Sequence, residues 1–303
     1  MERSEDVKIL VTGANGYLGQ GIVRYILDTS GADNNSVVAT DIATDHVDSR
    51  AERINCDLFT VENPFECFGK PDILLHLAWR DGFVHYSDKH IDDLPKHYAF
   101  IKKMTNAEGL KLVACMGSMH EIGFWEGAIK EDTPCNPTTP YGIAKNALRQ
   151  LTAMLCKQKN KAFLWLRGFY IVGNSQYGSS IFSKMTAAEQ EGKETFPFTM
   201  GQNQFDFIDY EDFCEQTARA VTQRGFLHQA ENDSNHEQCA VLGIINICSG
   251  HPEKLADRVE RFIKDNNYKI KLSYGAFPDR PYDSKAVWGD NSKIERILAT
   301  SKS

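Results

Sequence analysis

A glycine-rich turn near the start of the chain constrains its fold more than any other feature. The apolar run Val7–Thr12 has the character of a strand, and a helical pattern covers residues 17–27. Between them lie Gly13, Gly16 and Gly19, at the spacing Gly-x-x-Gly-x-x-Gly. Such glycines let the backbone turn tightly and approach a pyrophosphate, which rests on the N-terminus of the following helix. A tight turn without a ligand is the alternative, but the context on both sides favours a dinucleotide site.

Apolar runs alternate with helical patterns after this turn. We expect strands over 36–40, 53–57, 72–78, 111–117 and 162–169, and helices over 91–105 and 141–157. Near-continuous apolar strands alternating with helices indicate a parallel sheet covered on both faces. Because such crossovers are right-handed, the sheet should be doubly wound. The sequence therefore predicts an α/β fold of Rossmann type.

The alternation becomes irregular after Gly173, although an apolar strand over 240–247 should return to the sheet. We predict a dinucleotide-binding domain made of residues 1–173 plus about 206–250. A smaller, C-terminal substrate-binding lobe would comprise about 174–205 plus 251–303 and close over the cofactor. The ligand should lie between them, at the carboxyl ends of the strands.

Composition excludes several classes of protein. The net charge of −7 argues against general affinity for nucleic acid or an anionic membrane. No apolar run approaches the ~20 residues that span a bilayer, and no signal peptide is expected. The eight cysteines are scattered without a Cys-x-x-Cys pair, which favours a reducing cytoplasm without disulfides or a zinc site. Because His85, His90 and His97 lack metal-ligand spacing, no metal is expected.

Two aspartates follow expected strands. Asp41 lies at the end of the second strand, where a carboxylate binds the adenosine ribose hydroxyls and repels a 2′-phosphate. It therefore favours NAD over NADP, unless it is a surface loop residue. Asp57 follows the third strand and could meet the adenine edge or simply cap a turn.

Tyr141 and Lys145 lie four positions apart in an expected helix and therefore on one face of it. An ammonium beside a phenol favours phenolate and lowers the phenol pKa from its reference near ~10. A phenol tuned towards neutral pH can exchange a proton with a sugar or alcohol oxygen. Ser118 ends an apolar strand upstream, and its hydroxyl can hydrogen-bond both a substrate oxygen and the tyrosine. A chance Tyr-x-x-x-Lys on a solvated helix is the alternative, but together with the glycine turn these residues predict hydride transfer with a proton relay.

His120 and Glu121 follow Ser118 directly. Either could be a second proton-transfer group that faces the sugar ring. Both could equally cap or pack the loop.

These motifs resemble those of the extended short-chain dehydrogenase/reductases, in the NAD-dependent epimerase/dehydratase family that acts on nucleotide sugars. The cofactor loop is Thr-Gly-Ala-Asn-Gly-Tyr-Leu-Gly at 12–19. Further matching segments are 56–58, 76–78, 131–137 with 141–145, 166–170, 206–212 and 280–293. The resemblance implies a cofactor site formed by Gly13, Asn15, Gly16, Tyr17, Leu18, Asp41, Asp57, Leu58, Leu77, Ala78, Tyr141 and Lys145.

Departures from the family pattern bear on the reaction. Sugar 4,6-dehydratases carry an Asp-Glu pair where Met119 and His120 stand, so dehydration is not expected. Epimerase-reductases place a Cys acid/base at the position of His120, where an imidazole could act near neutral pH. Tyr170 replaces a frequent Asn, and Phe205 replaces an Arg that grips the substrate pyrophosphate. Arg280 is then the main candidate for that phosphate.

The segments 116–125 and 165–173 resemble those of 4-keto-6-deoxy nucleotide-sugar reductases. We therefore expect an NAD-dependent reductase of C4, with Tyr141 as acid/base, Ser118 and Lys145 as its partners, and Ser118, His120, Tyr170 and Arg280 contacting substrate. A nucleotide-sugar 4-epimerase and a non-catalytic dinucleotide sensor are the alternatives. Family dimers form through the Tyr-x-x-x-Lys helix and its neighbour, so a homodimer is expected. The apolar face of Ala144, Leu148, Leu151 and Leu155 would suit such an interface or a core.

Overall fold

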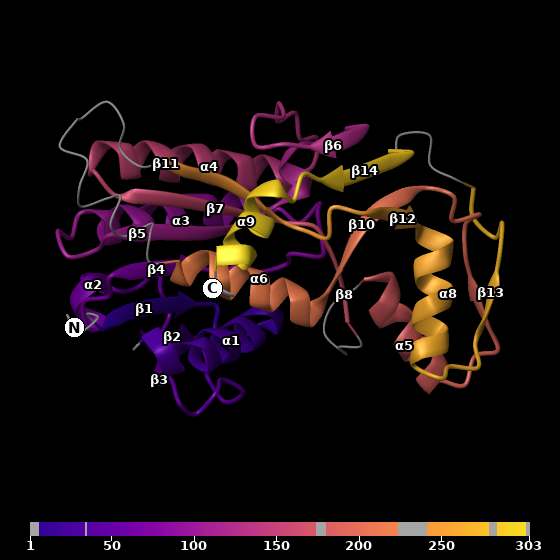
Figure 1. Cartoon of the computed structure of the whole chain (residues 1–303), viewed down its shortest axis with the longest axis horizontal. Coiled ribbons are helices and arrows are strands. Elements are labelled where there is room, and N and C mark those ends of the chain that lie inside the picture. Colours follow the sequence, from indigo (N-terminus) through magenta and orange to yellow (C-terminus); the bar gives the residue numbers. More distant parts are fainter. Residues whose placement is uncertain (1–5, 34, 174–179, 224–240, 279–283, 301–303) are drawn as a thin grey trace.

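The computed structural model describes residues 6–33, 35–173, 180–223, 241–278 and 284–300 of the chain. A larger α/β domain lies beside a smaller lobe (Figure 1). Arg280, the expected phosphate ligand, lies outside the described residues. Within the described ranges, no helix is both long enough and apolar enough to cross a bilayer.

The larger domain is built on a seven-stranded parallel sheet, which confirms the Rossmann-type prediction. The strand order is β11-β7-β5-β4-β1-β2-β3, so successive crossovers run outward in opposite directions from β1 and β4. That reversal is the topological switch point where such sheets bind ligands. Its strands are β1 (Val7–Thr12), β2 (Asn35–Asp41), β3 (Glu52–Asn55), β4 (Ile73–His76), β5 (Leu112–Ser118), β7 (Ala162–Gly168) and β11 (Val241–Ile247).

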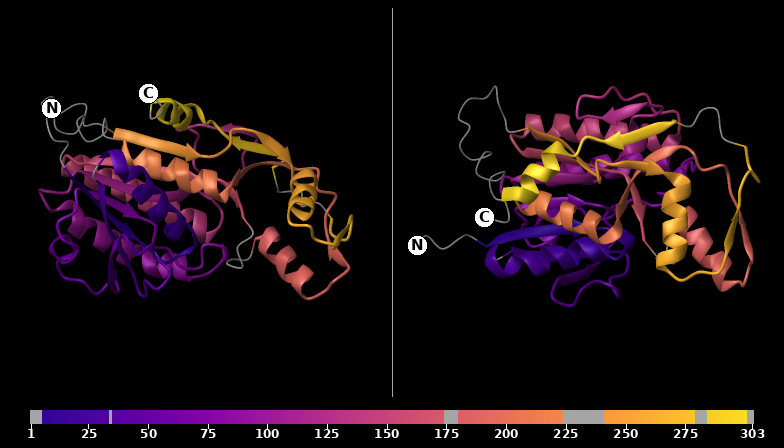
Figure 2. Two further views of the ribbon diagram at one scale, coloured as in Figure 1. Left: turned by 60° about the horizontal axis from the view of Figure 1, so that its bottom comes forward. Right: turned by 45° about the vertical axis from the view of Figure 1, so that its right-hand side comes forward.

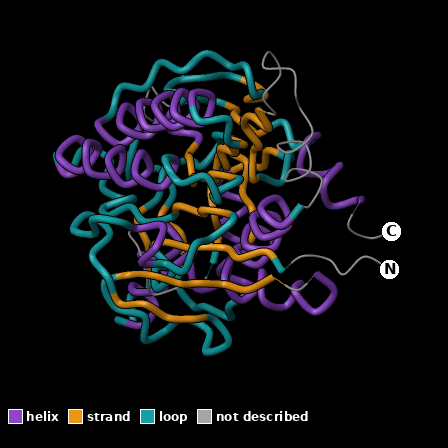
Figure 3. Tube along the Cα trace, turned by 90° about the vertical axis from the view of Figure 1, so that its left-hand side faces the viewer, coloured by secondary structure: helices purple, strands orange, loops and turns teal. Residues whose placement is uncertain are grey.

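Both faces of this sheet are covered, which explains why its strands are apolar at nearly every position. Along β1, Ile9 and Val11 pack into one core cluster, whereas Leu10 packs into the other. Side chains alternate because successive residues of a strand point to opposite faces. Figure 3 shows helices on both sides of the strands. One side carries α1 (Tyr17–Asp33), α6 (Tyr210–Thr222) and α9 (Ser292–Thr300); the other carries α2 (Pro64–Cys67), α3 (Lys89–Thr105) and α4 (Pro140–Gln158).

The smaller lobe contains a second, five-stranded sheet and a two-stranded ribbon. Strand order is β12-β10-β14-β6, with β8 also paired to β10, while β13 pairs with β9. Figure 2 shows the lobe projecting from one end of the larger domain. Its elements are η1 (Met119–Glu121), β6 (Gly127–Ile129), β8 (Tyr170–Val172), α5 (Ile181–Gln190), β9 (Thr195–Pro197), β10 (Gln204–Asp209), β12 (Pro252–Lys254), α8 (Leu255–Asp265), β13 (Lys271–Ser273) and β14 (Ala286–Gly289), of which η1 connects it to β5.

The strands of the smaller sheet come from segments far apart in the sequence. β6 and β8 lie at residues 127–129 and 170–172, whereas β12 and β14 lie at 252–254 and 286–289. Conversely, α9 packs against α6 and β11 of the larger domain. The predicted domain boundaries stay a prediction, because β6 and β8 come from the range predicted for the larger domain and α9 comes from the range predicted for the smaller lobe.

Candidate active site

A cavity of about 1210 Å³ opens at the carboxyl ends of the large sheet and extends to the smaller lobe. It is lined by residues that follow β1, β2, β4, β5 and β7. Asn15 does not line it. The expected site residues that do are Gly13, Gly16, Tyr17, Leu18, Asp41, Asp57, Leu58, Leu77, Ala78, Ser118, His120, Tyr141, Lys145 and Tyr170.

Two of the three glycines of the turn are packed too tightly to carry a side chain. Gly13 has a φ of +70°, and a Cβ there would lie 2.6 Å from the backbone nitrogen of Ala78. A Cβ on Gly19 would lie 2.2 Å from the carbonyl oxygen of Gly13. The turn therefore presents bare backbone to the cavity at the N-terminus of α1, as a pyrophosphate requires.

Asp41 completes this end of the cavity. Its carboxylate accepts hydrogen bonds from the backbone N–H groups of Asn15, at 3.0 Å, and Ile42, at 2.8 Å. Asn15 holds the next loop, because its Oδ1 accepts from the N–H of His46 at 2.9 Å. The negative carboxylate at the end of β2, beside bare backbone, fits a dinucleotide with an unphosphorylated ribose.

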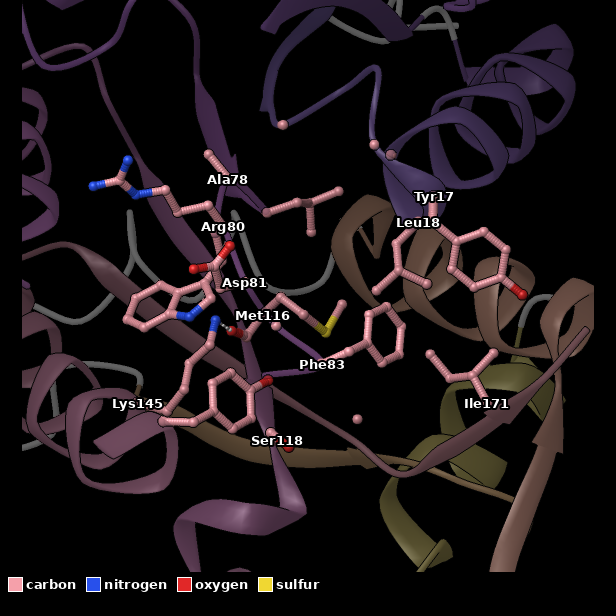
Figure 4. Close-up of a pocket in the computed structure, with 18 of the residues that line it drawn as sticks. Tyr17, Leu18, Ala78, Arg80, Asp81, Phe83, Met116, Ser118, Lys145 and Ile171 are labelled. Carbon is pink, nitrogen blue, oxygen red and sulfur yellow. Dashed lines mark hydrogen bonds between the residues drawn. The ribbon is translucent and has the colours of Figure 1, made fainter. Parts of the chain in front are cut away.

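The Tyr-x-x-x-Lys pair lies in the first turns of α4. Thr139 caps this helix by accepting from the N–H of Gly142 at 3.2 Å, and Pro140 occupies its first turn. Tyr141 therefore starts the helix and Lys145 follows one turn later. The Lys145 ammonium donates to the carbonyl oxygen of Met116 at 2.9 Å, as Figure 4 shows.

Burial corrects the predicted electrostatics of this pair. Burial raises the pKa of Tyr141 to about 12, although a hydrogen bond with Ser118 acts in the opposite direction. The prediction that Lys145 brings this pKa towards neutral is therefore wrong for the protein without ligands. Burial also lowers the pKa of Lys145 itself to about 7, and its Nζ lies 6.0 Å from the Tyr141 ring centroid. At that distance the ammonium does not offset the desolvation of the phenolate.

His120 lines the cavity but is not poised for acid/base work near neutral pH. Its ring lies between those of Tyr141, at 6.1 Å, and Tyr170, at 5.9 Å. Burial, with a smaller effect of His85, lowers the pKa of His120 to about 3. The imidazole is thus neutral at pH 7 and can donate and accept hydrogen bonds with a sugar hydroxyl, but it does not carry the acidic proton of an imidazolium.

Glu121 faces away from the cavity, and it packs the loop. Its side chain is fully buried and accepts from Trp165 Nε1, at 2.8 Å, and from Arg167 Nε, at 2.7 Å. A buried carboxylate paired in this way has a structural role, so it holds η1 and Ser118 against β7.

An aromatic cluster around the Tyr-x-x-x-Lys pair was missed from the sequence. His85 stacks on Tyr141 with 5.0 Å between ring centroids, and the Tyr141 N–H donates to the His85 carbonyl oxygen at 3.1 Å. Trp79 stacks on His97 at 4.6 Å. The sequence offered one signal, a density of His and aromatic residues over 76–98. In the described part of the chain, no group of three or more His, Cys, Asp or Glu residues could hold a metal ion.

The opposite end of the cavity, towards the smaller lobe, is also aromatic. Tyr170 lies 5.1 Å from Phe205 and 5.8 Å from Phe207, measured between ring centroids. Phe83 enters from the loop after β4, and Figure 4 draws it among the cavity side chains with Ile171. Phe205, which replaces the Arg of the family pattern, is thus part of a continuous apolar wall of the cavity.

Comparison with known proteins agrees with this geometry. The sequence profile of the NAD dependent epimerase/dehydratase family matches residues 9–231. Among curated proteins, the chain is similar to a dTDP-6-deoxy-L-talose 4-dehydrogenase (NAD(+)) of Aggregatibacter actinomycetemcomitans. The two are 38% identical over 289 residues, which cover 93% of this chain and 99% of that protein.

Solved structures share the fold at lower identity. A UDP-glucuronic acid 4-epimerase from Bacillus cereus, in complex with UDP-glucuronic acid and NAD, superposes with a TM-score of 0.76 at 21% identity, covering 97% of this chain and 93% of that one. A UDP-N-acetylglucosamine 4-epimerase from Methanobrevibacter ruminantium M1 gives 0.76 at 20% identity, covering 97% and 92%.

Proposed function

Because this chain belongs to the NAD-dependent epimerase/dehydratase family, we propose that it oxidises and reduces C4 of a 6-deoxy nucleotide sugar. The first candidate substrate is dTDP-6-deoxy-L-talose, on which the relative with 38% identity is named to act. One observation carries the proposal: Ser118, Tyr141 and Lys145 line the same cavity as the glycine turn and Asp41.

NAD supplies the hydride acceptor in the oxidation and, once reduced, the hydride donor in the reverse reaction. In reduction the Tyr141 phenol gives its proton to the 4-keto oxygen and becomes phenolate; in oxidation that phenolate takes the proton of the 4-hydroxyl. Ser118 holds that oxygen by a hydrogen bond and also contacts the phenol. Lys145, in its charged state, lowers the energy of the phenolate that forms when the proton leaves.

The substrate would contact the residues at the end of the cavity near the smaller lobe. His120 is neutral and lies between Tyr141 and Tyr170, so it is suited to a hydroxyl beside C4. The aromatic surface of Tyr170, Phe205 and Phe83 suits a sugar whose C6 is a methyl group. Arg280 remains the proposed phosphate ligand.

The test is a panel of nucleotide sugars, followed by NADH absorbance and by product analysis. We expect dTDP-6-deoxy-L-talose to reduce NAD, whereas UDP-glucose and UDP-glucuronic acid should react poorly. Interconversion of the talose sugar with its C4 epimer, without net NADH, would instead identify a 4-epimerase. A blank panel with intact NAD binding would overturn the proposal.

The variant Tyr141→Phe tests the assigned role. We expect turnover to fall by about 10²–10⁴-fold, because positioned proton transfer contributes this much. NAD affinity, from a fluorescence titration, should stay unchanged. Tyr86→Phe is the matched control, since Tyr86 is 75% exposed. Near-normal turnover in Tyr141→Phe would contradict the role.

We also propose a cytoplasmic homodimer that associates through α3 and α4. These helices pack side by side and leave Ile91, Ile143 and Met154 exposed. Of the face predicted to suit either an interface or a core, Ala144, Leu148 and Leu155 are buried within the protomer and Leu151 is half-buried. Sedimentation of the wild type and of Ile143→Glu tests the assembly.

A further inference from the structure

We propose that Trp79 is a positioning residue for this reaction, whose indole face holds the Lys145 ammonium in place and in its charged form. The inference rests on the proposed function, because Lys145 assists the chemistry only in an oxidoreductase. Trp79 follows the end of β4 and lines the cavity, and neither the family profile nor the relatives' names assign it a role.

The contact between the two side chains is direct. Lys145 Nζ lies 3.9 Å from the centroid of the Trp79 ring, while it donates to the Met116 carbonyl oxygen at 2.9 Å. A cation within about 6 Å of an aromatic face is attracted by the ring quadrupole, and tryptophan gives the strongest attraction. The attraction is greatest where water is excluded, as it is around the buried Lys145.

The indole plane is fixed from its edge and from a face. Its Nε1–H donates to His90 Nδ1 at 3.1 Å. Because an indole nitrogen can only donate, His90 must carry its own proton on Nε2, which donates to the Val84 carbonyl oxygen at 3.0 Å. Stacking on His97, with 4.6 Å between centroids and 16° between planes, orients the ring further. Trp79 is therefore held by contacts that leave little freedom to turn away from Lys145.

The other groups around Lys145 do not replace this contact. His76 on β4 and His97 on α3 are held neutral by burial. Burial also raises the pKa of Cys115 on β5, so its thiol is uncharged. Glu121 on η1 favours the ammonium from a distance but is paired with Arg167. In the part of the chain that the structure describes, no carboxylate forms an ion pair with Lys145, so the Trp79 face and the Met116 carbonyl are its direct stabilising contacts. Tyr141, on the same helix, is the group that its charge serves.

The first test measures the titration of Lys145 itself. Carbon-13 labelling of lysine Cε, with the resonance assigned from Lys145→Met, reports its pKa in the full-length protein without substrate. In Trp79→Leu we expect this pKa to fall by about one pH unit, the size of a desolvated cation–π contact. The alkaline limb of turnover against pH should shift downward by the same amount. Trp79→Phe keeps a ring face and should restore most of the shift.

Trp125→Leu is the matched control. Trp125 also makes an indole hydrogen bond, to the Ala128 carbonyl oxygen at 3.2 Å, but it lies outside the cavity lining. The variant Trp125→Leu should leave the pKa of Lys145 unchanged even if the thermal stability of the protein falls. An unchanged titration in folded Trp79→Leu, or a shift of equal size in Trp125→Leu, would overturn the inference.

Fluorinated tryptophan gives the same test without changing side-chain size. Because ring fluorines weaken the quadrupole, the Lys145 pKa should fall stepwise from mono- to difluorotryptophan. No dependence on fluorination would overturn the inference even if Trp79→Leu does not fold. The titration needs no sugar, so a blank substrate panel beside a shifted pKa would remove the proposed function and leave the contact standing.

Discussion

The two ends of the cavity are built from different kinds of chemical group. The end beside β1 and β2 is backbone and one carboxylate: the glycine turn, the ends of the strands and Asp41. The end beside the smaller lobe is aromatic side chains, including Tyr170 and Phe205, from segments far apart in the sequence. A backbone site tolerates almost no change of residue, whereas a side-chain wall can be altered without losing the fold. Substitutions at the first end should therefore affect cofactor binding and stability, and those at the second should affect substrate alone.

Gly13→Ala should give the largest effect. An Ala at a φ of +70° costs about 1–2 kcal/mol, and its Cβ would also collide with the Ala78 backbone. We expect a lower melting temperature. NAD should bind at least roughly tenfold more weakly, a loss of about 1.4 kcal/mol or more of binding free energy. Gly192→Ala isolates the conformational cost, because Gly192 has a φ of +71° but open space around its Cβ position. Equal losses in the two variants would show that close approach to β4 is unimportant.

Acid should lower the free energy of unfolding, because His97 is buried in its neutral form. His97 Nδ1 lies 2.9 Å from His76 Nε2, and burial lowers the pKa of His97 to about 3 from 6.5. The unfolded chain binds this proton already near pH 6.5, so the stability is complete above that pH and is lost as pH falls towards 3. His97 alone should contribute at most about 1.4 kcal/mol per pH unit to this slope, and His76 and His120, whose pKa values burial also lowers, add to it.

Denaturant unfolding at several pH values measures this slope. His97→Asn should flatten it, whereas His46→Asn, at an exposed position, should not. An unchanged slope in His97→Asn would contradict the prediction.

Asp41→Ser should shift the choice of cofactor. Removing the carboxylate removes its repulsion of a 2′-phosphate, so the ratio of kcat/KM for NAD over NADP should fall about tenfold. Asp57→Ser removes an equal charge from another part of the cavity lining and should weaken both cofactors alike. A ratio that responds equally to both variants would argue that net charge, rather than the position of Asp41, sets the preference.

Phe205→Ala should have the smallest effect and should affect only the substrate end. Loss of its contact with Tyr170 removes about 1 kcal/mol, so substrate KM should rise roughly fivefold while NAD affinity stays constant. Phe124→Ala, at a position that is 60% exposed, is the control. A change in NAD affinity in Phe205→Ala would contradict the expectation that the aromatic end acts on substrate alone.

This contrast also explains what could be predicted from the sequence. The strand expected over 111–117 spans Leu112–Ser118, because a continuous apolar run between helices is buried as a strand of the parallel sheet. Gly13, Asp41 and Tyr141 are fixed by short-range spacing, and all three line the cavity. Trp79, His85 and His90 meet around α4 only through tertiary packing, so no local pattern could pair them.

Charge states were the least predictable property. The spacing of Tyr141 and Lys145 was sufficient to place them on one face, but their pKa values depend on how deeply the folded chain buries both. The same applies to His120, whose neutrality follows from its neighbours.

The interleaving of the two sheets limits how this protein can be re-engineered. The polypeptide passes from β7 of the large sheet to β8 and β10 of the small one, back to β11, and out again to β12 and β14. No single cut separates a cofactor module from a substrate module, so grafting a relative's C-terminal segment would replace some strands of the small sheet and leave mismatched partners for the rest. Specificity in such a chain has to change residue by residue, in place, and the two bodies should unfold in one cooperative transition.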